Sequence, residues 1–406
     1  MAAANQESTL SDDRPAGRSP ARTHWSNLLA LGDEAITDGR LADAFEHCKN
    51  ALRIAKESGP GSDWLAESYV RLADICAALD RQNAALRLYG RGVAILNRLP
   101  NGVSVLLAHA VSNMGRLRML NGETATAVEL TAAADALQRK LNAPESPAIK
   151  LNLALVEATA GRDRDADEAF RDVLAATDRC RGTGGALVFA VHDNFARFCI
   201  WRGRKADAEM ALRSCLILRQ EAGGPRHPVY ADGLVNLARM HLLYDAEDEA
   251  ESLLWQAADV YRHNGDAPAA ALVEAIYLLA RIAQQGERAD EAGALCNQLF
   301  TLGEENTSAT AAAQAAALHI GARLRLAGPD RMAAETPMRQ ALGLAGGLRG
   351  DFRRLGNDIS GDLLRELSDL LVEIGKDAEA ERLIARADEL RGQPQWGVTG
   401  FVFADP

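Results

Sequence analysis

Four asparagines and four arginines recur along this chain at intervals that suit the binding of another polypeptide. The asparagines are Asn113, Asn152, Asn194 and Asn236, and the arginines are Arg116, Arg197, Arg239 and Arg281. A side-chain amide has one acceptor and two donors, which match the C=O and N–H groups of a peptide backbone. A guanidinium presents planar donors that fit a carboxylate. Such rows would hold an extended chain through its backbone and add contacts to acidic side chains or a free C-terminus.

These intervals come from an internal repeat. Asn194 and Asn236 are separated by the same interval as Ala208 and Ala250. The period is about 42 residues, and repeats of about 20–50 residues are typical of stacked structural units. Aligned on the small residue of each second helix, the repeats fall at Ala44, Ala85, Ala127, Ala166 or Ala169, Ala208, Ala250, Ala292, Ala334 and Ala380. The sequence therefore predicts nine helix pairs that cover residues 23–391.

Each pair shows the pattern of two amphipathic helices. Apolar or small residues stand at relative positions 4, 7, 8 and 11 of the first helix, which forms one stripe on its surface. In the sixth pair these residues are Leu234, Leu237, Ala238 and His241. Glycine often follows the first helix, as at Gly203, and glycine is expected just past a helix end. Pro337 falls in the second helix of the eighth pair and should shorten or kink it.

The motifs of the first pair resemble a known repeat family. That pair has Leu31-Gly32 in its first helix and Ala44, Cys48 and Ala51 in its second. This arrangement resembles the tetratricopeptide repeat, with Leu-Gly-x-x-Tyr in one helix and Ala-x-x-x-Phe-x-x-Ala in the other. The family's usual period is about 34 residues. The longer period here, and the Gly-Pro-Arg-His-Pro link at residues 224–228, resemble the kinesin-light-chain variety. The resemblance implies an all-α, TPR-like α/α superhelical solenoid that serves as a scaffold for protein–protein interaction.

The asparagine and arginine rows lie opposite the core stripe of the first helices, at positions 6 and 9. Kinesin-light-chain repeats use asparagines of the first helix on the cargo-peptide backbone, so the resemblance implies a concave peptide-binding groove on this side. Trp201 lies beside Asn194 and Arg197 and is either an aromatic anchor for a bound segment or a cover for the next repeat. The alternative for the rows themselves is that they stabilise the stacking of adjacent first helices.

The two ends of the chain differ from the array. Residues 1–22 are polar, and we expect a disordered segment there. The last pair carries Glu366 among charged residues on outer faces, which suits a polar capping repeat. Residues 392–406 form an apolar tail with Trp396, Phe401 and Phe403. This tail is a candidate for docking into the groove of its own chain or of a neighbour.

Composition and motifs limit the classes of function. The formal net charge of −11 argues against nucleic acid and anionic membranes, which attract basic surfaces. No apolar run reads as a signal peptide or membrane span, so we expect a cytoplasmic protein. The cysteines are expected to be reduced core residues, and they are Cys48, Cys76, Cys180, Cys199, Cys215 and Cys296. No phosphate-loop, dinucleotide, zinc-protease or serine-hydrolase motif is present, so we expect no enzyme, no cofactor and no metal.

These observations favour a protein–protein interaction module that binds an extended peptide or protein segment through the asparagine and arginine rows. One alternative is a regulatory sensor that binds a signalling peptide or small effector and passes the signal to a partner protein. A further alternative is an enzyme built on a repeat scaffold.

Overall fold

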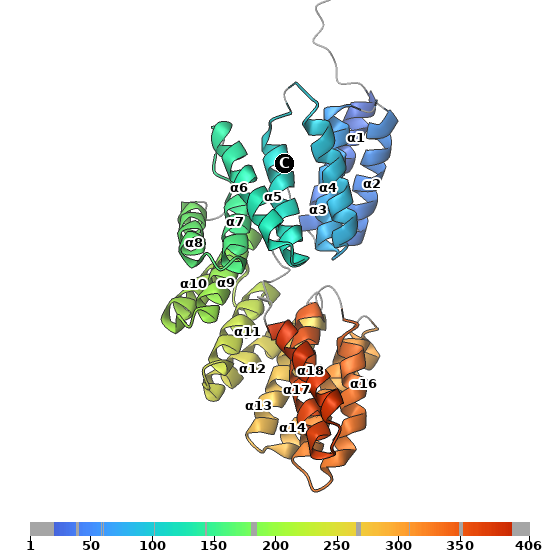
Figure 1. Ribbon diagram of the computed structural model, residues 1–406, viewed down its shortest axis with the longest axis vertical. Coiled ribbons are helices and arrows are strands. Elements are labelled where there is room, and N and C mark those ends of the chain that lie inside the picture. The colour runs from blue at the N-terminus through green and yellow to red at the C-terminus, as the bar shows by residue number, and fades with distance from the viewer. Residues whose placement is uncertain are drawn as a thin grey trace, which may run out of the picture. The chain divides into compact units, whose positions relative to one another are not determined.

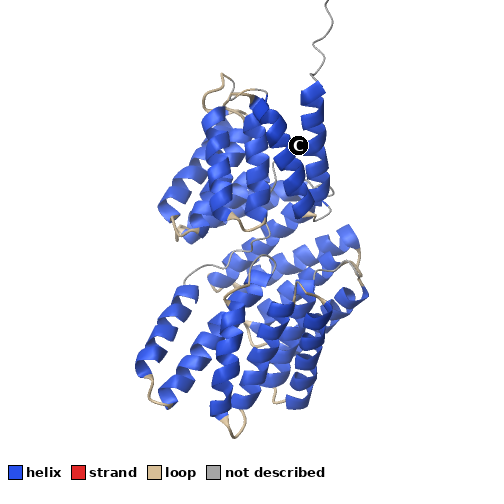
Figure 2. Cartoon of the chain, turned by 90° about the vertical axis from the view of Figure 1, so that its right-hand side faces the viewer, coloured by secondary structure: helices blue, strands red, loops and turns tan. Residues whose placement is uncertain are grey.

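The computed structural model describes residues 20–37, 40–57, 59, 61–100, 102–142, 144–179, 185–264, 269–307, 309–348 and 352–391. Within these ranges the regular structure consists of eighteen α-helices and one 3₁₀-helix, with no strand. Figure 2 shows this helical content. The prediction of an all-α chain is confirmed.

The helices of the described ranges form nine pairs in chain order, as the repeat predicts. The first helices are α1 (Pro20–Thr37), α3 (Asp63–Ala78), α5 (Val105–Leu120), α7 (Pro147–Thr159), α9 (Gly185–Trp201), α11 (Pro228–Leu242), α13 (Ala269–Gln285), α15 (Thr310–Leu326) and α17 (Arg353–Glu373). The second helices are α2 (Leu41–Glu57), α4 (Gln82–Leu96), α6 (Thr124–Lys140), α8 (Asp163–Arg179), α10 (Lys205–Gly223), α12 (Glu247–His263), α14 (Ala289–Glu305), α16 (Glu335–Ala345) and α18 (Asp377–Arg391).

The described residues divide into two compact units. Unit 1 extends to Ala110 and contains α1 to α4 with the start of α5, and unit 2 begins at Val111 and contains the rest. The core of unit 1 gathers apolar side chains of α1, α2 and α3, among them Trp25 and Tyr69. In unit 2 the pairs follow one another through α18, as Figure 1 shows, over a buried core rich in alanine. Small side chains allow helices to pack closely, so each pair buries its stripe against the next.

The register of the repeat is set by one buried alanine near the start of each second helix. Ala208 is the fourth residue of α10, Ala250 is the fourth residue of α12, and both are fully buried. Ala166 holds the same place in α8 and is also fully buried, whereas Ala169 lies one turn further on. The fourth repeat is therefore aligned on Ala166.

The turns within the pairs place one residue in the left-handed region. Gly203 follows α9 with a φ of 71°, and the next N–H, of Arg204, donates to the carbonyl of Cys199 at 2.8 Å. Glycine adopts this conformation without steric cost. The sixth and seventh pairs make the same turn at Asp245 and Glu287, with φ values of 55° and 59°. Because these residues carry a Cβ, their turns are strained.

The eighth pair departs from the others where Pro337 predicts it. A 3₁₀-helix, Arg331–Ala334, takes the place of the first turn, and α16 is only 11 residues long. Pro337 is the third residue of α16. Proline is tolerated there because the first N–H groups of a helix have no partner within the helix.

Candidate ligand-binding face of unit 2

The first two asparagines of the row lie between adjacent helices. Asn113 of α5 and Asn152 of α7 are 1% and 3% exposed. The Nδ2 group of Asn152 donates to Oδ1 of Asn113 at 2.9 Å and to Oγ of Ser112 at 3.0 Å. Arg116 is buried beside them on α5, 1% exposed. Asn113 and Asn152 link α5 to α7, as the alternative interpretation of the row expects, and burial keeps all three side chains from offering an open face to a ligand.

Asn194 of α9 is also buried. Its Nδ2 donates to the carbonyl of Ala190 on the preceding turn at 2.8 Å. Its Oδ1 is buried without a hydrogen-bond partner among the described residues. A buried acceptor without a donor is costly, so this atom marks a place where a donor group would be stabilised.

The remaining asparagine is engaged by α17. Oδ1 of Asn236 accepts from Nη1 of Arg354 at 3.1 Å, across 118 residues of sequence. Arg354 also lies 3.6 Å from Oε1 of Glu274, through its Nε. The inner side of α11 and α13 is therefore in contact with the last helix pair of the same unit.

Three arginines of the first helices pair with three carboxylates of α17. Arg239 donates to Asp358 and, at 2.8 Å, to Glu274. Arg281 lies 3.5 Å from Asp362. Arg323 of α15 lies 3.3 Å from Glu366. From here on, the arginine row means Arg197, Arg239, Arg281 and Arg323, which leaves out the buried Arg116 and adds Arg323. We call Asp358, Asp362 and Glu366 the carboxylate ladder.

The placement of Glu366 corrects the expectation of an outward-facing charge on the capping pair. Its Oε2 lies 3.2 Å from Nε2 of His319, a residue with no exposed surface. Nδ1 of His319 lies 2.9 Å from the hydroxyl of Tyr277. Glu366, His319 and Tyr277 thus form a series of polar side-chain contacts that links α17, α15 and α13.

Arg197 differs from the rest of the arginine row. It is partly buried on α9 and, among the described residues, makes no ion pair and no side-chain hydrogen bond. Burial, together with the charges of Arg354 and Arg239, lowers the pKa of its guanidinium to about 10, against the raising effect of Asp193 and Glu274. Desolvation and two neighbouring cations both disfavour a charged group, so an anion placed beside Arg197 would be stabilised.

The neighbouring arginines show how this local charge is distributed. Burial and the nearby Arg239 also lower the pKa of Arg354. For Arg239, burial acts to lower the pKa, but Asp358 and Glu274 outweigh it and raise the pKa above its usual value. Arg239 is thus neutralised by carboxylates, whereas positive charge remains around Arg197 and Arg354.

Trp201 completes the face of α9. It lies four residues after Arg197, so both fall on the same side of the helix. Its side chain is 45% exposed, and the guanidinium of Arg202 stacks over the ring at 4.0 Å from its centroid. The exposed indole suits an aromatic anchor better than a cover for the next repeat.

The histidine and cysteines of the fifth pair belong to the core. His192 Nδ1 lies 3.1 Å from the carbonyl of Val188, and Cys199 and Cys215 are buried. Burial raises the pKa of both thiols to about 12, which keeps them protonated and unreactive. Cys48, Cys76 and Cys296 are likewise buried and free. In the part of the chain that the structure describes, no three His, Cys, Asp or Glu side chains gather to hold a metal ion.

The sequence analysis missed Arg323 and the carboxylate ladder. Arg323 could have been found, because it follows Arg281 by the same interval as Arg281 follows Arg239. The ladder residues are spaced four apart on α17, but nothing in the local pattern names their partners on α11, α13 and α15. Cys180 and the tail residues Trp396, Phe401 and Phe403 lie outside the described residues. No helix in the described ranges is long and apolar enough to cross a membrane.

Comparisons with known proteins agree with this architecture. A family model described as tetratricopeptide repeat matches residues 26–98. The apo form of the quorum sensor NprR from B. thuringiensis has 12% identity and a TM-score of 0.55, and the match covers 91% of this chain and 98% of that chain. The apo form of RapI has 10% identity, a TM-score of 0.59 and coverages of 92% and 99%.

A third solved structure, a Rap protein complexed with competence and sporulation factor, has 13% identity, a TM-score of 0.54 and coverages of 92% and 99%. At these identities the likeness concerns the fold. A comparison with curated protein sequences finds no match.

Proposed function

This chain is a tetratricopeptide-repeat protein, and we propose that it binds an extended peptide or protein segment along the first helices of unit 2. The observation that carries the proposal is Arg197, whose guanidinium has no ion-pair partner among the described residues and has two arginines nearby. Every other member of the arginine row is neutralised by a carboxylate of its own chain. An anionic group of a ligand would therefore be held most strongly at α9.

The same face of α9 supplies the other contacts that a peptide needs. A side-chain carboxylate or a C-terminus would pair with Arg197. An apolar residue of the ligand would pack on the exposed ring of Trp201. The asparagine row has a narrower role than the sequence indicates, because Asn113 and Asn152 hold α5 against α7.

Replacing Arg197 by Met tests this proposal, because Met keeps the apolar stem and removes the charge. The probe is a pool of fluorescein-labelled decapeptides rich in Glu, each with a free C-terminus, and binding is followed by fluorescence anisotropy. A hydrogen-bonded ion pair contributes about 1.5–3 kcal/mol, so affinity should fall roughly tenfold or more. Trp201→Ala should weaken the same peptides.

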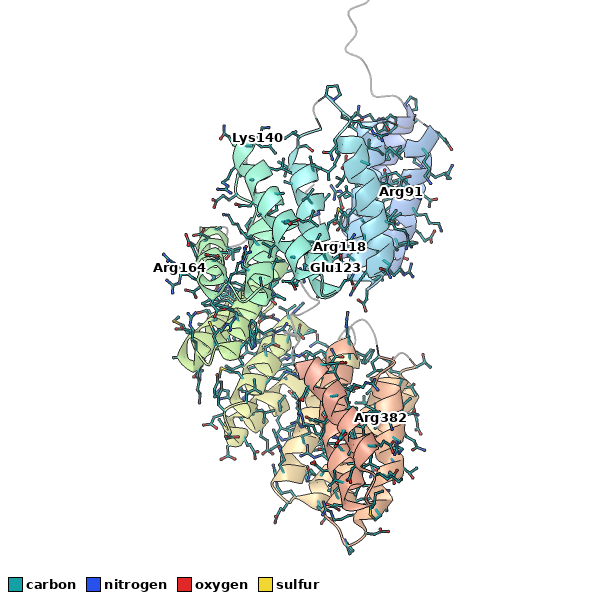
Figure 3. The ribbon with its side chains drawn as sticks, viewed as in Figure 1. Arg91, Arg118, Glu123, Lys140, Arg164 and Arg382 are labelled. Carbon is teal, nitrogen blue, oxygen red and sulfur yellow. The ribbon has the colours of Figure 1, made fainter. Side chains whose placement is uncertain are left out.

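Arg164→Met is the matched control. Arg164 is exposed on α8, and Figure 3 shows its side chain directed away from the helices. This variant should bind the peptides as the unmodified protein does. Equal affinity in Arg197→Met and the unmodified protein would refute the site. Equal affinity of the unmodified protein for the acidic pool and for a Lys-rich, C-terminally amidated pool would refute the proposed ligand class.

A regulatory sensor is the second candidate function. It is favoured by the fold shared with structures described as a quorum sensor and as a Rap protein complexed with competence and sporulation factor. A sensor would bind a signalling peptide or a small effector and pass the change to a partner protein. Thermal-shift screening against short peptides, sugars and nucleotides separates the ligand classes, and a sensor for a small effector should be stabilised by sugars or nucleotides instead of peptides.

A further inference from the structure

The carboxylate ladder and the arginine row have matched periods. Asp358, Asp362 and Glu366 are four residues apart, so they form one ridge along α17. Arg239, Arg281 and Arg323 are one repeat apart, and one lies on each of α11, α13 and α15. One carboxylate per helical turn therefore meets one guanidinium per repeat, in the order Asp358–Arg239, Asp362–Arg281 and Glu366–Arg323.

The ladder is a different surface from the one that packs α17 into its own pair. Leu363, Leu367 and Leu371 are fully buried on the apolar side of the helix, which packs on α15, α16 and α18. In the described residues, Arg354, Asp358 and Asp362 form hydrogen bonds and ion pairs from α17 to α11 and α13. The ladder can therefore open without unfolding α17.

Opening the ladder would leave an excess of positive charge on this side of unit 2. The arginine row brings four guanidinium groups, whereas Arg354 lies on α17 and moves with the last helix pair. Without the ladder, Glu274 is the one carboxylate among the described residues that stays in direct contact with Arg239. Like charges at short range repel, so a ligand that brings its own carboxylates is the natural replacement for the ladder.

We propose that the carboxylate ladder is an electrostatic latch that holds the last helix pair against α11 and α13, and that an acidic ligand opens it by competing for the arginine row. The claim that an acidic ligand opens the latch rests on the proposed function, whereas the claim that the ladder holds the last helix pair does not. In the closed state Arg197 is the one member of the row open to a ligand. In the open state Arg239 and Arg281 become available as well, so the site extends from the fifth pair to the seventh.

The latch is tested by a distance across it in the full-length chain. Spin labels are placed at Leu243→Cys and Val372→Cys, two exposed residues outside the ladder, in a Cys180→Ser background. The described native thiols are buried and protonated and will not compete for label. Pulsed electron spin resonance should show a longer and broader distance distribution in the D358N/D362N/E366Q variant.

Asp369→Asn is the matched control, because Asp369 is exposed on α17 and makes no ion pair among the described residues. It should leave the distances unchanged, while circular dichroism reports the helicity of each variant. An unchanged distribution in a fully helical D358N/D362N/E366Q variant overturns the latch. If that variant loses helicity, D362R and the charge exchange R281D/D362R are measured instead. D362R should lengthen the distance between the labels, and R281D/D362R should restore it. Failure of either result overturns the latch.

Peptide binding separates the latch from the proposed function. If both hold, D358N/D362N/E366Q should bind the Glu-rich decapeptides at least fivefold more tightly than the unmodified protein. If the distance lengthens and neither protein binds the peptides, the latch stands and the proposed function fails. If peptides bind the unmodified protein through Arg197 and the triple variant is no tighter, the claim that a ligand competes with the ladder fails.

Discussion

Burial decides which polar side chains of the first helices can meet a ligand. Asn152 is 3% exposed and its amide is taken by Asn113 and Ser112, whereas Trp201 on the next first helix is 45% exposed. A buried amide must keep its hydrogen bonds, since leaving a polar group unpaired costs about 1–3 kcal/mol. Asn113 and Asn152 therefore act between helices, and the site that we propose uses Arg197 and Trp201 instead.

A buried ion pair behind this face gives the prediction at the residue scale. Nη2 of Arg219 on α10 donates to Oδ2 of Asp193 on α9 at 2.6 Å, and both side chains are buried. Asp193→Ala removes one partner and leaves a buried cation, which should reduce the free energy of unfolding by about 3–5 kcal/mol. Urea denaturation followed by circular dichroism measures the loss.

Asp172→Ala is the control for this experiment. Asp172 is an exposed residue of α8, so its replacement should change the free energy of unfolding by about 0.5 kcal/mol or less. A loss in Asp193→Ala no larger than in this control would contradict the structural role of the pair.

The sequence identified these side chains by type and repeat position, but not their exposure. Periodicity tells which residues share a helix face. It does not tell how closely the next helix approaches, because that distance depends on side chains of other segments. Gly115 is an example: a Cβ there would lie 2.7 Å from Cγ2 of Thr131 on α6, so α5 and α6 come close only because the residue is glycine.

At the scale of the helix, α17 has two structural roles: core packing within its own pair and ion pairing with earlier pairs. Its leucines build the core of the last pair, and its carboxylates cross to α11, α13 and α15. The sequence predicts the first role, because the stripe at Leu364, Leu367 and Leu371 repeats that of earlier pairs. The second depends on partners that lie far away in sequence, at a separation of 47 for Glu366 with His319 and 119 for Asp358 with Arg239. A local pattern does not contain such partners.

The strained turn between α13 and α14 gives the prediction at the element scale. Glu287 is exposed and holds a φ of 59°, where a Cβ costs about 1–2 kcal/mol relative to glycine. Glycine loses more backbone entropy on folding, by about 0.5–1 kcal/mol. Glu287→Gly should therefore raise the free energy of unfolding by roughly 0.5–1 kcal/mol, measured as a higher urea midpoint.

The converse substitution tests the same physical cause. Gly203 has a φ of 71° with open space around its missing Cβ, so Gly203→Ala meets backbone strain and no steric clash. It should lower the urea midpoint. If Glu287→Gly also lowers the midpoint, left-handed strain is not what limits these turns.

At the scale of the molecule, the two units differ in how their carboxyl groups respond to acid. In unit 1, burial raises the pKa of Asp33 and of Glu67, against the lowering effect of Arg71. In unit 2, burial acts to raise the pKa of Glu366, but His319, Arg323 and Arg281 outweigh it and lower the pKa. Burial raises the pKa of Asp232, against Tyr261 and Arg219, so unit 2 contains both kinds of shift.

These shifts have opposite signs in the pH dependence of stability. As pH falls, a carboxyl with a raised pKa takes up its proton in the folded state at a higher pH than in the unfolded state. Proton binding then favours the folded state, so unit 1 gains stability as pH falls from 7 toward about 4.5. A carboxyl with a lowered pKa contributes stability above its unfolded value, and that contribution is lost as pH falls through the lower folded value. The ion pair of Glu366 should therefore weaken only below about pH 4.5.

Hydrogen exchange resolved along the chain measures the two responses separately. From pH 7 to pH 5, corrected for intrinsic rates, protection of α3 should rise, and below pH 4.5 protection of α17 should fall. Glu67→Gln should reduce the rise in α3, because it removes one buried charge, and Glu366→Gln should remove the part of the fall in α17 that comes from Glu366. If α17 loses protection equally with Gln at residue 366, its response to acid arises elsewhere, and the contact of Glu366 with His319 and Arg323 is not what holds the last pair in place.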